Sequence, residues 1–311
     1  ISSSRIKIGI DAMGGDFAPS EILLGAQLAI KKYDNIEVVL FGEESKLSGL
    51  LQDYQNFTII GTEDSIGMSE NPTRAVASKK RSSINVGLKS LNEGKIDTFL
   101  SAGNTGAVMV SAMHHVGLLE GYQRPILSTF LPKIKGELPL LLDVGANADC
   151  KPEHLNQFAM LGSNLIQSVY GIMKPKVVLL NIGEEKEKGN ILYKAAHKLL
   201  AENKEINFIG NLEGRELFVT SAHVVVCDGF TGNIILKTAE GLGQQFIDRG
   251  INDDYLNKFD YKKHGGTPLL GLKKPVIIGH GISKKDTVVN MIKLGVDIVD
   301  SNLFKKIEQS L

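Results

Sequence analysis

The sequence predicts an α/β protein of two lobes, built on a mostly parallel sheet with helices on both faces. Short apolar runs rich in Val, Ile and Leu alternate with helical patterns over nearly all of the 311 residues. Most of these runs lack alternating polar residues, which is typical of strands covered on both faces. The length is typical of one large domain or of two lobes, and we expect the boundary between the lobes near residues 100–140.

The strand predictions follow from short apolar runs, most of which are bounded by turn-forming residues. The predicted strands are Ile6–Ile10, Ile36–Phe41, Phe57–Ile60, Thr98–Ser101, Leu138–Asp143, Lys176–Leu180, Ile206–Ile209, Val224–Cys227 and Val276–Ile278.

Helix predictions rest on recognisable start signals. Pro19-Ser20-Glu21 opens a helix over Ser20–Tyr33, and Pro152-Glu153 opens one that runs to about Tyr170. Asn71 precedes a proline at the first helical position, which predicts one continuous helix from Pro72 to about Asn92. Strands that alternate with helices in this way predict a parallel sheet with right-handed crossovers.

Composition excludes several classes of protein. Lys+Arg and Asp+Glu are both 35, so the absence of net charge argues against a general nucleic-acid binder. The two cysteines, Cys150 and Cys227, form no metal-binding or disulfide pattern, so we expect neither a structural zinc site nor a disulfide-stapled secreted domain. We also expect no other metal and no cofactor. No apolar run approaches the roughly 18 residues of a spanning helix, and no signal-peptide pattern is present. We therefore expect a cytoplasmic protein.

Glycine-rich turns come directly after many of the predicted strands. The chain has 33 glycines, and glycine allows backbone amides to approach a ligand closely. The carboxyl ends of parallel strands line the ligand crevice of open α/β sheets, and a helix that starts there presents N–H groups and a positive dipole end. The turns therefore predict an anion site, most plausibly for phosphate. The predicted phosphate- or substrate-binding residues are Asp11, Gly14, Gly15, Asp16, Gly103, Asn104, Thr105, Gly106, Asp143, Gly145, Asn147, Glu184, Asp228, Gly229, Thr231 and Gly232.

The alternative for any single turn is an ordinary tight turn, because Gly-Asn and Asp-Gly are common turn dipeptides. The sequence contains no Gly-x-Gly-x-x-Gly that opens a helix, no P-loop and no Gly-x-Ser-x-Gly elbow. These absences disfavour NAD, ATP and serine-hydrolase chemistry.

Charged residues near the turns allow two interpretations each. Lys188 follows a predicted strand and either neutralises a phosphate or belongs to an exposed charged loop. His264, before a glycine pair, is either a site residue or a surface histidine. The basic run Lys79-Lys80-Arg81 lies on the predicted 72–92 helix. It is either a solvated face of that helix or a docking patch for an acidic partner.

Taken together, the motifs resemble the bacterial phosphate acyltransferases of phospholipid synthesis, the PlsX family. The resemblance runs in order over nearly the whole chain. The motifs that carry it are Ile8–Pro19, Ser101–Ala107, Asp143–Asp149, Asp228–Asn233 and Lys263–Gly266.

The resemblance implies an activity and its partners. It implies conversion of acyl-[acyl carrier protein] and inorganic phosphate into acyl phosphate and free carrier protein, on a fold similar to isopropylmalate dehydrogenases and phosphotransacetylases. It also implies a cytoplasmic homodimer with peripheral membrane contact and hand-off to a membrane glycerol-3-phosphate acyltransferase. The open alternatives are a phosphotransacetylase acting on acyl-CoA, a non-catalytic scaffold that binds acyl carrier protein, and an NAD-dependent decarboxylating dehydrogenase.

This chemistry needs no protein nucleophile. Phosphate is itself an anionic nucleophile. The leaving group is a thiolate whose thiol has a pKa of about 8.5, so it leaves with little acid assistance. The site must orient phosphate and stabilise an oxyanion. The expected catalytic residues are Lys188, Asn233 and His264, with the amides of Asn104 and Asn233 as oxyanion donors, while Lys79, Lys80 and Arg81 are expected to dock the acidic carrier protein.

The predicted domain is a single two-lobed catalytic unit over residues 5–311. Within it, Gly243–Lys263 is expected to be irregular or shortened, because members of the family carry a longer helical hairpin there. That departure weakens the expected membrane contact.

Overall fold

The protein was analysed as a computed structural model, which describes residues 5–50, 57–133, 138–251, 253–256 and 265–309. The chain divides into two compact units. The first contains Ile1–Leu119 and Lys262–Phe304, and the second contains Glu120–Tyr261 and Lys305–Leu311. The first boundary between the units, after Leu119, lies inside the interval 100–140. The chain returns to the second unit after Phe304, within helix α10 (Leu303–Gln309).

The first unit contains a sheet in the order β3-β2-β1-β4-β11-β10. All neighbouring pairs are parallel except β10 and β11. Strands β1, β2, β4 and β11 carry short apolar runs that are largely buried on both faces, whereas β3 at the edge of the sheet has no buried residue. The strands are β1 (Ile6–Asp11), β2 (Ile36–Gly42), β3 (Phe57–Gly61), β4 (Thr98–Ser101), β10 (Thr267–Leu270) and β11 (Val276–Ile278).

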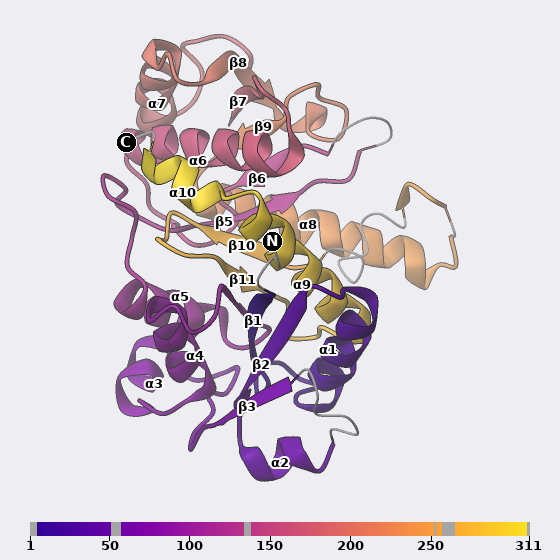
Figure 1. The fold of residues 1–311 in the computed structure, drawn as a ribbon. Helices are drawn as coiled ribbons and strands as arrows, with labels where there is room; N and C mark the ends of the chain where they lie inside the picture. The colour runs from indigo at the N-terminus through magenta and orange to yellow at the C-terminus, as the bar shows by residue number, and fades with distance from the viewer. Residues whose placement is uncertain (1–4, 51–56, 134–137, 252, 257–264, 310–311) are drawn as a thin grey trace. The chain divides into compact units, whose positions relative to one another are not determined.

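Helices cover both faces of this sheet. The helices are α1 (Ser20–Lys32), α2 (Glu44–Ser48), α3 (Pro72–Ser78), α4 (Ser83–Asn92), α5 (Thr105–His115) and α9 (Lys285–Asp300). Helices α1 and α9 lie on one side of the strands, and α3 to α5 lie on the other (Figure 1). At Gly25 in α1, an added Cβ would lie 2.5 Å from the Cβ of Val288 in α9, so glycine permits the close approach of these helices.

The predicted continuous helix from Pro72 to Asn92 is wrong, because the structure has two helices there. The side chain of Asn85 donates to the carbonyls of Val76 (3.0 Å) and Lys79 (2.9 Å), which satisfies the end of α3. Ser82 then caps α4 by accepting from the N–H of Asn85. The basic run Lys79-Lys80-Arg81 therefore lies in the connection between the helices.

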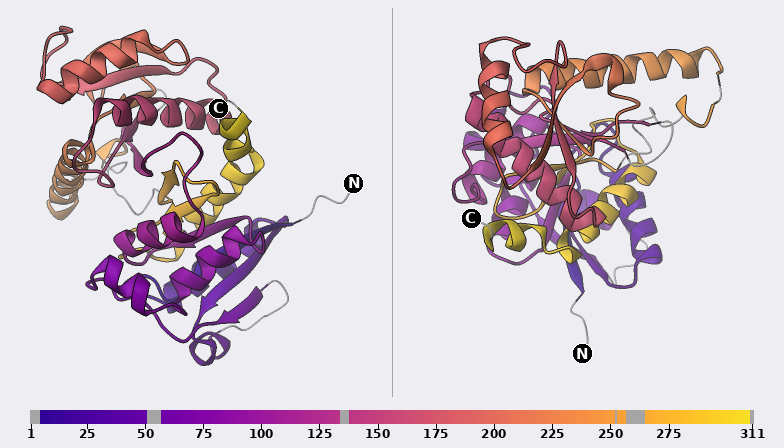
Figure 2. Two further views of the ribbon diagram at one scale, coloured as in Figure 1. Left: turned by 90° about the vertical axis from the view of Figure 1, so that its left-hand side faces the viewer. Right: turned by 90° about the horizontal axis from the view of Figure 1, so that it is seen from above.

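The second unit contains a sheet in the order β5-β6-β9-β7-β8. Its neighbouring strands are parallel except for β5 and β6. The strands are β5 (Ile126–Phe130), β6 (Leu140–Leu142), β7 (Lys176–Asn181), β8 (Asn207–Glu213) and β9 (Val224–Val226). The helices are α6 (Pro152–Tyr170), α7 (Ile191–Glu202), the short 3₁₀ helix Gly214–Glu216 and α8 (Gly229–Asp248), the long orange helix of Figure 2.

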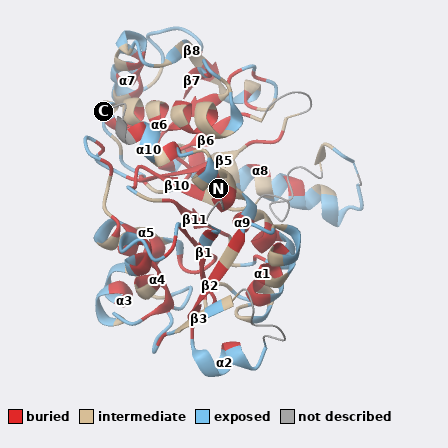
Figure 3. Cartoon of the chain, in the orientation of Figure 1, coloured by how far each residue is buried: buried red, intermediate tan, exposed pale blue. Residues whose placement is uncertain are grey.

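Each unit has its own apolar core. In the first, the rings of Phe41 and Phe99 meet edge to face with centroids 6.1 Å apart. In the second, β6 and β9 are buried over their full lengths, as the colouring of Figure 3 shows. Among the described residues, no helix combines the length and the apolar character needed to cross a membrane. The prediction of an α/β protein with a mostly parallel sheet and helices on both faces is confirmed.

The segment expected to be irregular begins as helix. Residues 243–248 form the end of α8, which continues without a break from Gly229. Residues 257–263 and His264 lie outside the described residues.

Candidate active site

Three turns of the first unit meet at one edge of its sheet. Strands β1, β4 and β11 are parallel neighbours, so the turns that follow them start at the same edge. The N–H of Asp16 donates to the carbonyl of Gly281 (2.7 Å), which links the turn after β1 to the turn after β11. At Gly14, an added Cβ would lie only 2.7 Å from the nitrogen of Gly103, so these two turns are in backbone contact.

The carboxylate of Asp11 is buried beneath these turns. It accepts from the hydroxyl of Ser101 (2.7 Å) and from the N–H of Met13 (3.1 Å). Burial raises the pKa of Asp11, while hydrogen bonds from Ser83 and Ser101 act in the opposite direction. Asp11 thus holds the turns together and does not face solvent, whereas Asp16 is exposed.

Asn104 has a structural role that corrects the expected one. Its side-chain nitrogen lies within hydrogen-bond distance of the carbonyls of Gly67 (3.2 Å), Met68 (3.1 Å) and Glu70 (3.0 Å). Its side-chain oxygen caps α5 by accepting from the N–H of Ala107 (3.1 Å). Because its amide is occupied on both sides, Asn104 is not an oxyanion donor in this arrangement.

The other predicted residues of this edge divide into packed and accessible groups. Gly103 is buried, and Gly106 packs on Pro72, where an added Cβ would lie 2.6 Å from a ring carbon. Gly15 is half-buried, with a φ of +104° that glycine adopts readily. Thr105 is exposed in the first turn of α5, where the helix presents its positive dipole end.

The second unit brings its own turns together. Strands β6, β9 and β7 are parallel neighbours, so the turns 143–147, 228–233 and 181–190 begin at one edge. The N–H of Gly229 donates to the carbonyl of Asn147 (2.7 Å), which joins the first two of these turns.

Asp143 organises the turn in which it lies. One carboxylate oxygen accepts from the N–H groups of Leu127, Gly145 and Ala146, and the other accepts from the N–H and side chain of Asn147 (2.7 and 2.8 Å). Burial raises the pKa of Asp143, and these donors oppose that shift. Asn147 also donates to the carbonyl of Pro125 (2.8 Å). Asp143 and Asn147 are therefore internal supports, not groups presented to a ligand.

The first turn of α8 packs tightly on this support. At Gly232, an added Cβ would overlap the carbonyl oxygen of Asp143, and at Gly229 it would lie 2.6 Å from the carbonyl oxygen of Asn147. The same packing sets Gly145 opposite Asn233, whose side-chain oxygen would lie 3.3 Å from a Cβ at Gly145. Gly145 and Asn233 are both exposed, so they form the accessible part of this turn pair.

Asp228 begins α8 by capping it. Its carboxylate accepts from the N–H of Thr231 (2.8 Å), from the hydroxyl of Thr231 (2.9 Å) and from the hydroxyl of Tyr193 on α7 (2.6 Å). A carboxylate at this position is favoured by the helix dipole.

The turn after β7 carries Lys188 on an exposed surface. The side chain of Asn181 donates to the carbonyl of Lys188 (3.2 Å) and fixes the turn from inside. The ammonium of Lys188 lies 3.8 Å from the Glu185 carboxylate in a solvent-exposed pair, which contributes little to stability. Glu184 is exposed nearby in sequence.

Neither cysteine is poised as a nucleophile. Burial raises the pKa of Cys150 to about 11, with a further contribution from Asp143. Burial also raises the pKa of Cys227 well above its usual value. Both thiols are therefore protonated at neutral pH, and thiolate is the reactive form. Among the described residues, no group of His, Cys, Asp or Glu side chains is placed to hold a metal ion.

The basic run is largely paired. Lys79 donates to Glu70 (2.7 Å) and to the carbonyl of Ser65 (2.8 Å), and Arg81 pairs with Glu63 (2.9 Å). Lys79 thus holds the 65–70 segment, while Lys80 and Arg81 remain exposed.

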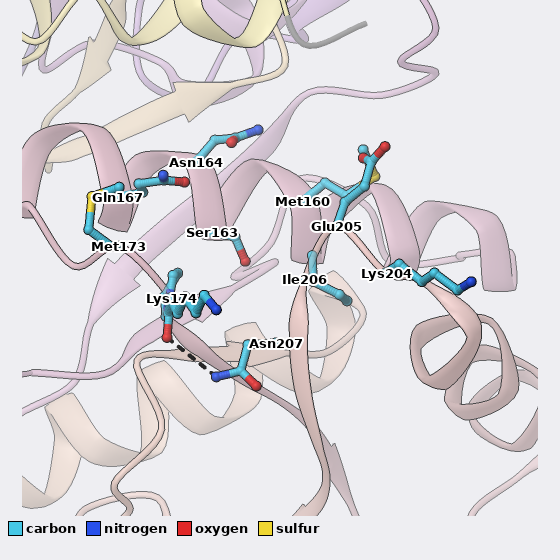
Figure 4. A pocket seen from close by; sticks show the side chains of 11 residues that line it. Met160, Ser163, Asn164, Gln167, Met173, Lys174, Lys204, Glu205, Ile206 and Asn207 are labelled. Atoms are coloured by element: carbon cyan, nitrogen blue, oxygen red, sulfur yellow. Dashed lines mark hydrogen bonds between the residues drawn. The ribbon is translucent and has the colours of Figure 1, made fainter.

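Two cavities of the second unit contain none of the predicted site residues. One, of about 590 Å³, lies where β7 and β8 begin and is lined by α6 and polar side chains such as Asn164 and Gln167 (Figure 4). The other, of about 470 Å³, is an apolar groove along α8 between Ile234 and Phe246. The predicted residues lie instead at the turn edge of each unit, and each edge is taken as a candidate site by itself.

The fold is shared with solved structures of phosphotransacetylases. A phosphotransacetylase from Streptococcus pyogenes superposes with a TM-score of 0.69 over 97% of this chain and 94% of its own, at 18% identity. The EutD phosphotransacetylase from Staphylococcus aureus gives 0.66 over 95% and 94%, at 21% identity. These identities show a shared fold.

Sequence comparison identifies the family. The family described as "Fatty acid synthesis protein" matches residues 6–253. The phosphate acyltransferase of Dictyoglomus thermophilum is 43% identical over 98% of both chains, and that of Thermoanaerobacterium thermosaccharolyticum is 41% identical over 98% of this chain and 97% of its own. The chain belongs to this family of phosphate acyltransferases and is an acyltransferase.

The alignment with the Dictyoglomus thermophilum protein extends over 329 residues, more than the 311 of this chain. That relative therefore carries residues within the aligned region that this chain lacks.

Sequence reasoning missed several residues that build these edges. Ser101 donates to Asp11, and Tyr193 donates to Asp228. Ser101 opens the Ser101–Ala107 motif but is given no role by it, and Tyr193 lies in no glycine-rich turn. The Gly279-His280-Gly281 turn after β11 could have been found, because it repeats the pattern of glycines after an apolar strand. Tyr193 offers no such signal, since it lies inside an ordinary helical pattern.

Proposed function

We propose that the protein transfers a fatty acyl group from acyl-[acyl carrier protein] to inorganic phosphate, giving an acyl phosphate for phospholipid synthesis. The observation that carries this proposal is the packing of the 143–147 turn on the first turn of α8, which leaves Gly145 and Asn233 accessible at a helix N-terminus. Helix N-termini favour anions, and membership of the family supports acyl transfer to phosphate.

In this proposal, a phosphate oxygen attacks the thioester carbonyl carbon. The carbonyl oxygen becomes an oxyanion, the C–S bond then breaks, and the thiolate leaves and takes a proton from water. The product retains a new bond between the acyl carbon and the phosphate oxygen. No residue needs to act as a covalent nucleophile, in agreement with the protonated state of Cys150 and Cys227.

The accessible groups of the second unit are assigned these roles. The N-terminus of α8 holds phosphate, and Thr231 supports this helix start through its two hydrogen bonds to Asp228. The side-chain amide of Asn233 donates to the oxyanion, which must lie about 3 Å from it. Lys188 offsets charge between the phosphate and the developing oxyanion. Asp143, Asn147 and Asp228 support these groups through the hydrogen bonds already described.

The first test is thiol release from a long-chain acyl-[acyl carrier protein], measured with and without inorganic phosphate. Phosphate-dependent release, with an acyl phosphate trapped by hydroxylamine, is expected. Release without phosphate would identify a thioesterase. Activity with acyl-CoA but not with the carrier protein would favour a phosphotransacetylase, and no release with either donor would favour a scaffold that binds the carrier protein.

The assigned residues are tested with a matched asparagine control. Asn233→Ala should reduce kcat about 10²-fold, the size of effect seen when one oxyanion donor is removed. Asn164→Ala, in the cavity at the strand starts, should leave kcat unchanged. Unchanged turnover in Lys188→Ala would remove that lysine from the mechanism.

Carrier-protein docking is assigned to Lys80 and Arg81. Both are exposed, whereas Lys79 is engaged with Glu70 and the 65–70 segment. Charge reversal at Lys80 and Arg81 should raise the apparent KM for the carrier protein and flatten its salt dependence. Lys89→Glu, on the exposed side of α4, is the control, and an equal effect there would leave no specific patch.

The family resemblance extends the proposal to the assembly and location of the protein. We include a homodimer in the cytoplasm, peripheral contact with the membrane, and transfer of the acyl phosphate to a membrane glycerol-3-phosphate acyltransferase. Sedimentation equilibrium and co-flotation with anionic lipid vesicles test the first two. A monomer, or protein that stays with the soluble fraction, would remove them.

A further inference from the structure

Tyr193 connects the two elements to which the proposed function assigns phosphate binding. It lies in the first turn of α7, with its side chain buried in the second unit. Its hydroxyl donates to a carboxylate oxygen of Asp228 (2.6 Å), and the hydroxyl oxygen accepts from the N–H of Asp228 (3.3 Å). The first of these is in the short range of hydrogen bonds between a hydroxyl and a carboxylate.

The same residue fixes the turn that carries Lys188. Asn190 caps α7 by accepting from the N–H of Tyr193 (3.0 Å). Gly189, with a φ of +93°, approaches Tyr193 so closely that an added Cβ would lie 2.8 Å from the tyrosine Cβ. The position of Tyr193 therefore couples the end of the Lys188 turn to the start of α8.

The charge of Asp228 makes this contact important for an anionic ligand. A carboxylate that caps a helix competes with phosphate for the positive end of the same dipole. In this structure its oxygens are directed to the N–H and hydroxyl of Thr231 and to Tyr193. Without the tyrosine hydroxyl, the carboxylate oxygen that accepts from it would keep its hydrogen bond from Thr231 but lose the shorter one, so the carboxylate would repel an anionic ligand more strongly.

We propose that Tyr193 is a positioning residue for phosphate: its hydroxyl holds and masks the carboxylate of Asp228 while its backbone anchors the Lys188 turn. The inference rests on the proposed function, because it needs phosphate to bind at the start of α8. Burial raises the pKa of Tyr193 far above its usual value, so the hydroxyl remains a donor throughout the working pH range.

The experiment compares Tyr193→Phe with Tyr122→Phe. Both tyrosines are buried in the second unit, at 7% and 8% exposure, but the Tyr122 hydroxyl has no hydrogen-bond partner among the described residues. Tyr193→Phe should raise the KM for inorganic phosphate about five- to tenfold, with kcat at saturating phosphate within about twofold of the wild type. Tyr122→Phe should leave both parameters unchanged.

A double-mutant cycle with Asp228→Asn separates masking of charge from general damage. If Tyr193 acts through the carboxylate, Tyr193→Phe should have little further effect on the phosphate KM once Asp228 is replaced. Additive effects of the two substitutions, or an unchanged KM in Tyr193→Phe, would overturn the inference. Absence of phosphate-dependent release in the wild type would instead refute the proposed function itself.

Discussion

Substitution of Gly232 by alanine tests whether the start of α8 must contact the 143–147 turn. The new Cβ would lie 1.9 Å from the carbonyl oxygen of Asp143 and 2.9 Å from the sulfur of Cys227. The first separation is shorter than an ordinary contact by about 1.5 Å, and the obstacle is backbone rather than a mobile side chain. Relief requires the helix start to move away by about 1 Å or more. Overpacking of this kind costs about 1–3 kcal/mol of the free energy of unfolding.

A shift of that size at the proposed phosphate site should reduce kcat/KM about 10²-fold. Gly241→Ala on the same helix is the control, because no atom lies within 4 Å of a Cβ there. That variant should gain about 0.5–1 kcal/mol from helix propensity and keep its activity. The measurements are denaturant unfolding followed by circular dichroism, and thiol release at varied phosphate. Wild-type stability and activity in Gly232→Ala would refute the reasoning about this contact.

Two further predictions concern the first unit. Asn104→Ala removes a helix cap and the contacts to the 67–70 segment. The free energy of unfolding should therefore fall by about 1–2 kcal/mol, and amide hydrogen exchange should become faster in that segment. Unchanged exchange at Gly67 would contradict this role of Asn104. Burial, with His114 and Lys89, lowers the pKa of His115 below 6.5, so the unfolded chain binds its proton more tightly than the folded one. Stability should therefore fall as the pH drops below about 6.5, and His115→Gln should flatten this dependence of the melting temperature; an identical pH profile in that variant would contradict it.

Most of the fold could be predicted because parallel strands carry a strong local signal. The strands Lys176–Asn181 and Ile36–Gly42 contain the continuous apolar runs Val177–Leu180 and Val38–Phe41, and their ends fall close to the predicted positions. The strands β5 and β10 were missed because each is an antiparallel neighbour with a weaker pattern. Ser128 and Thr129 interrupt β5, and Pro268 lies within β10.

The break between α3 and α4 could not be read from local pattern. Helix-forming residues continue through Lys79 and Lys80, and no proline or glycine marks an end. The end is set by Asn85, whose side chain turns back onto carbonyls of α3 from one turn into the next helix. A tertiary hydrogen bond thus overrides helix propensity, which is a weak local preference.

The sequence predicts which turns meet at each sheet edge, but it says less about what the individual side chains contact. Order along the chain shows which strand a turn follows, but the carboxylates of Asp11 and Asp143 are directed inward by burial and by N–H donors from their own turns. Tyr193 contacts Asp228 from another helix, 35 residues away in the sequence, so no short motif could predict this contact.

The glycines show that a predicted position can be occupied by glycine for a different physical reason. Glycine was expected to let backbone approach a ligand, yet Gly14, Gly229 and Gly232 are required because two protein backbones approach each other. Gly145 differs, since it is exposed, has a φ of +135° and faces the side chain of Asn233. Substitution of a packed glycine therefore displaces a helix, whereas substitution at Gly145 strains one turn and narrows the space beside Asn233. Of these four glycines, Gly145 is therefore the one at which the proposed ligand-facing role can be tested without displacing a helix.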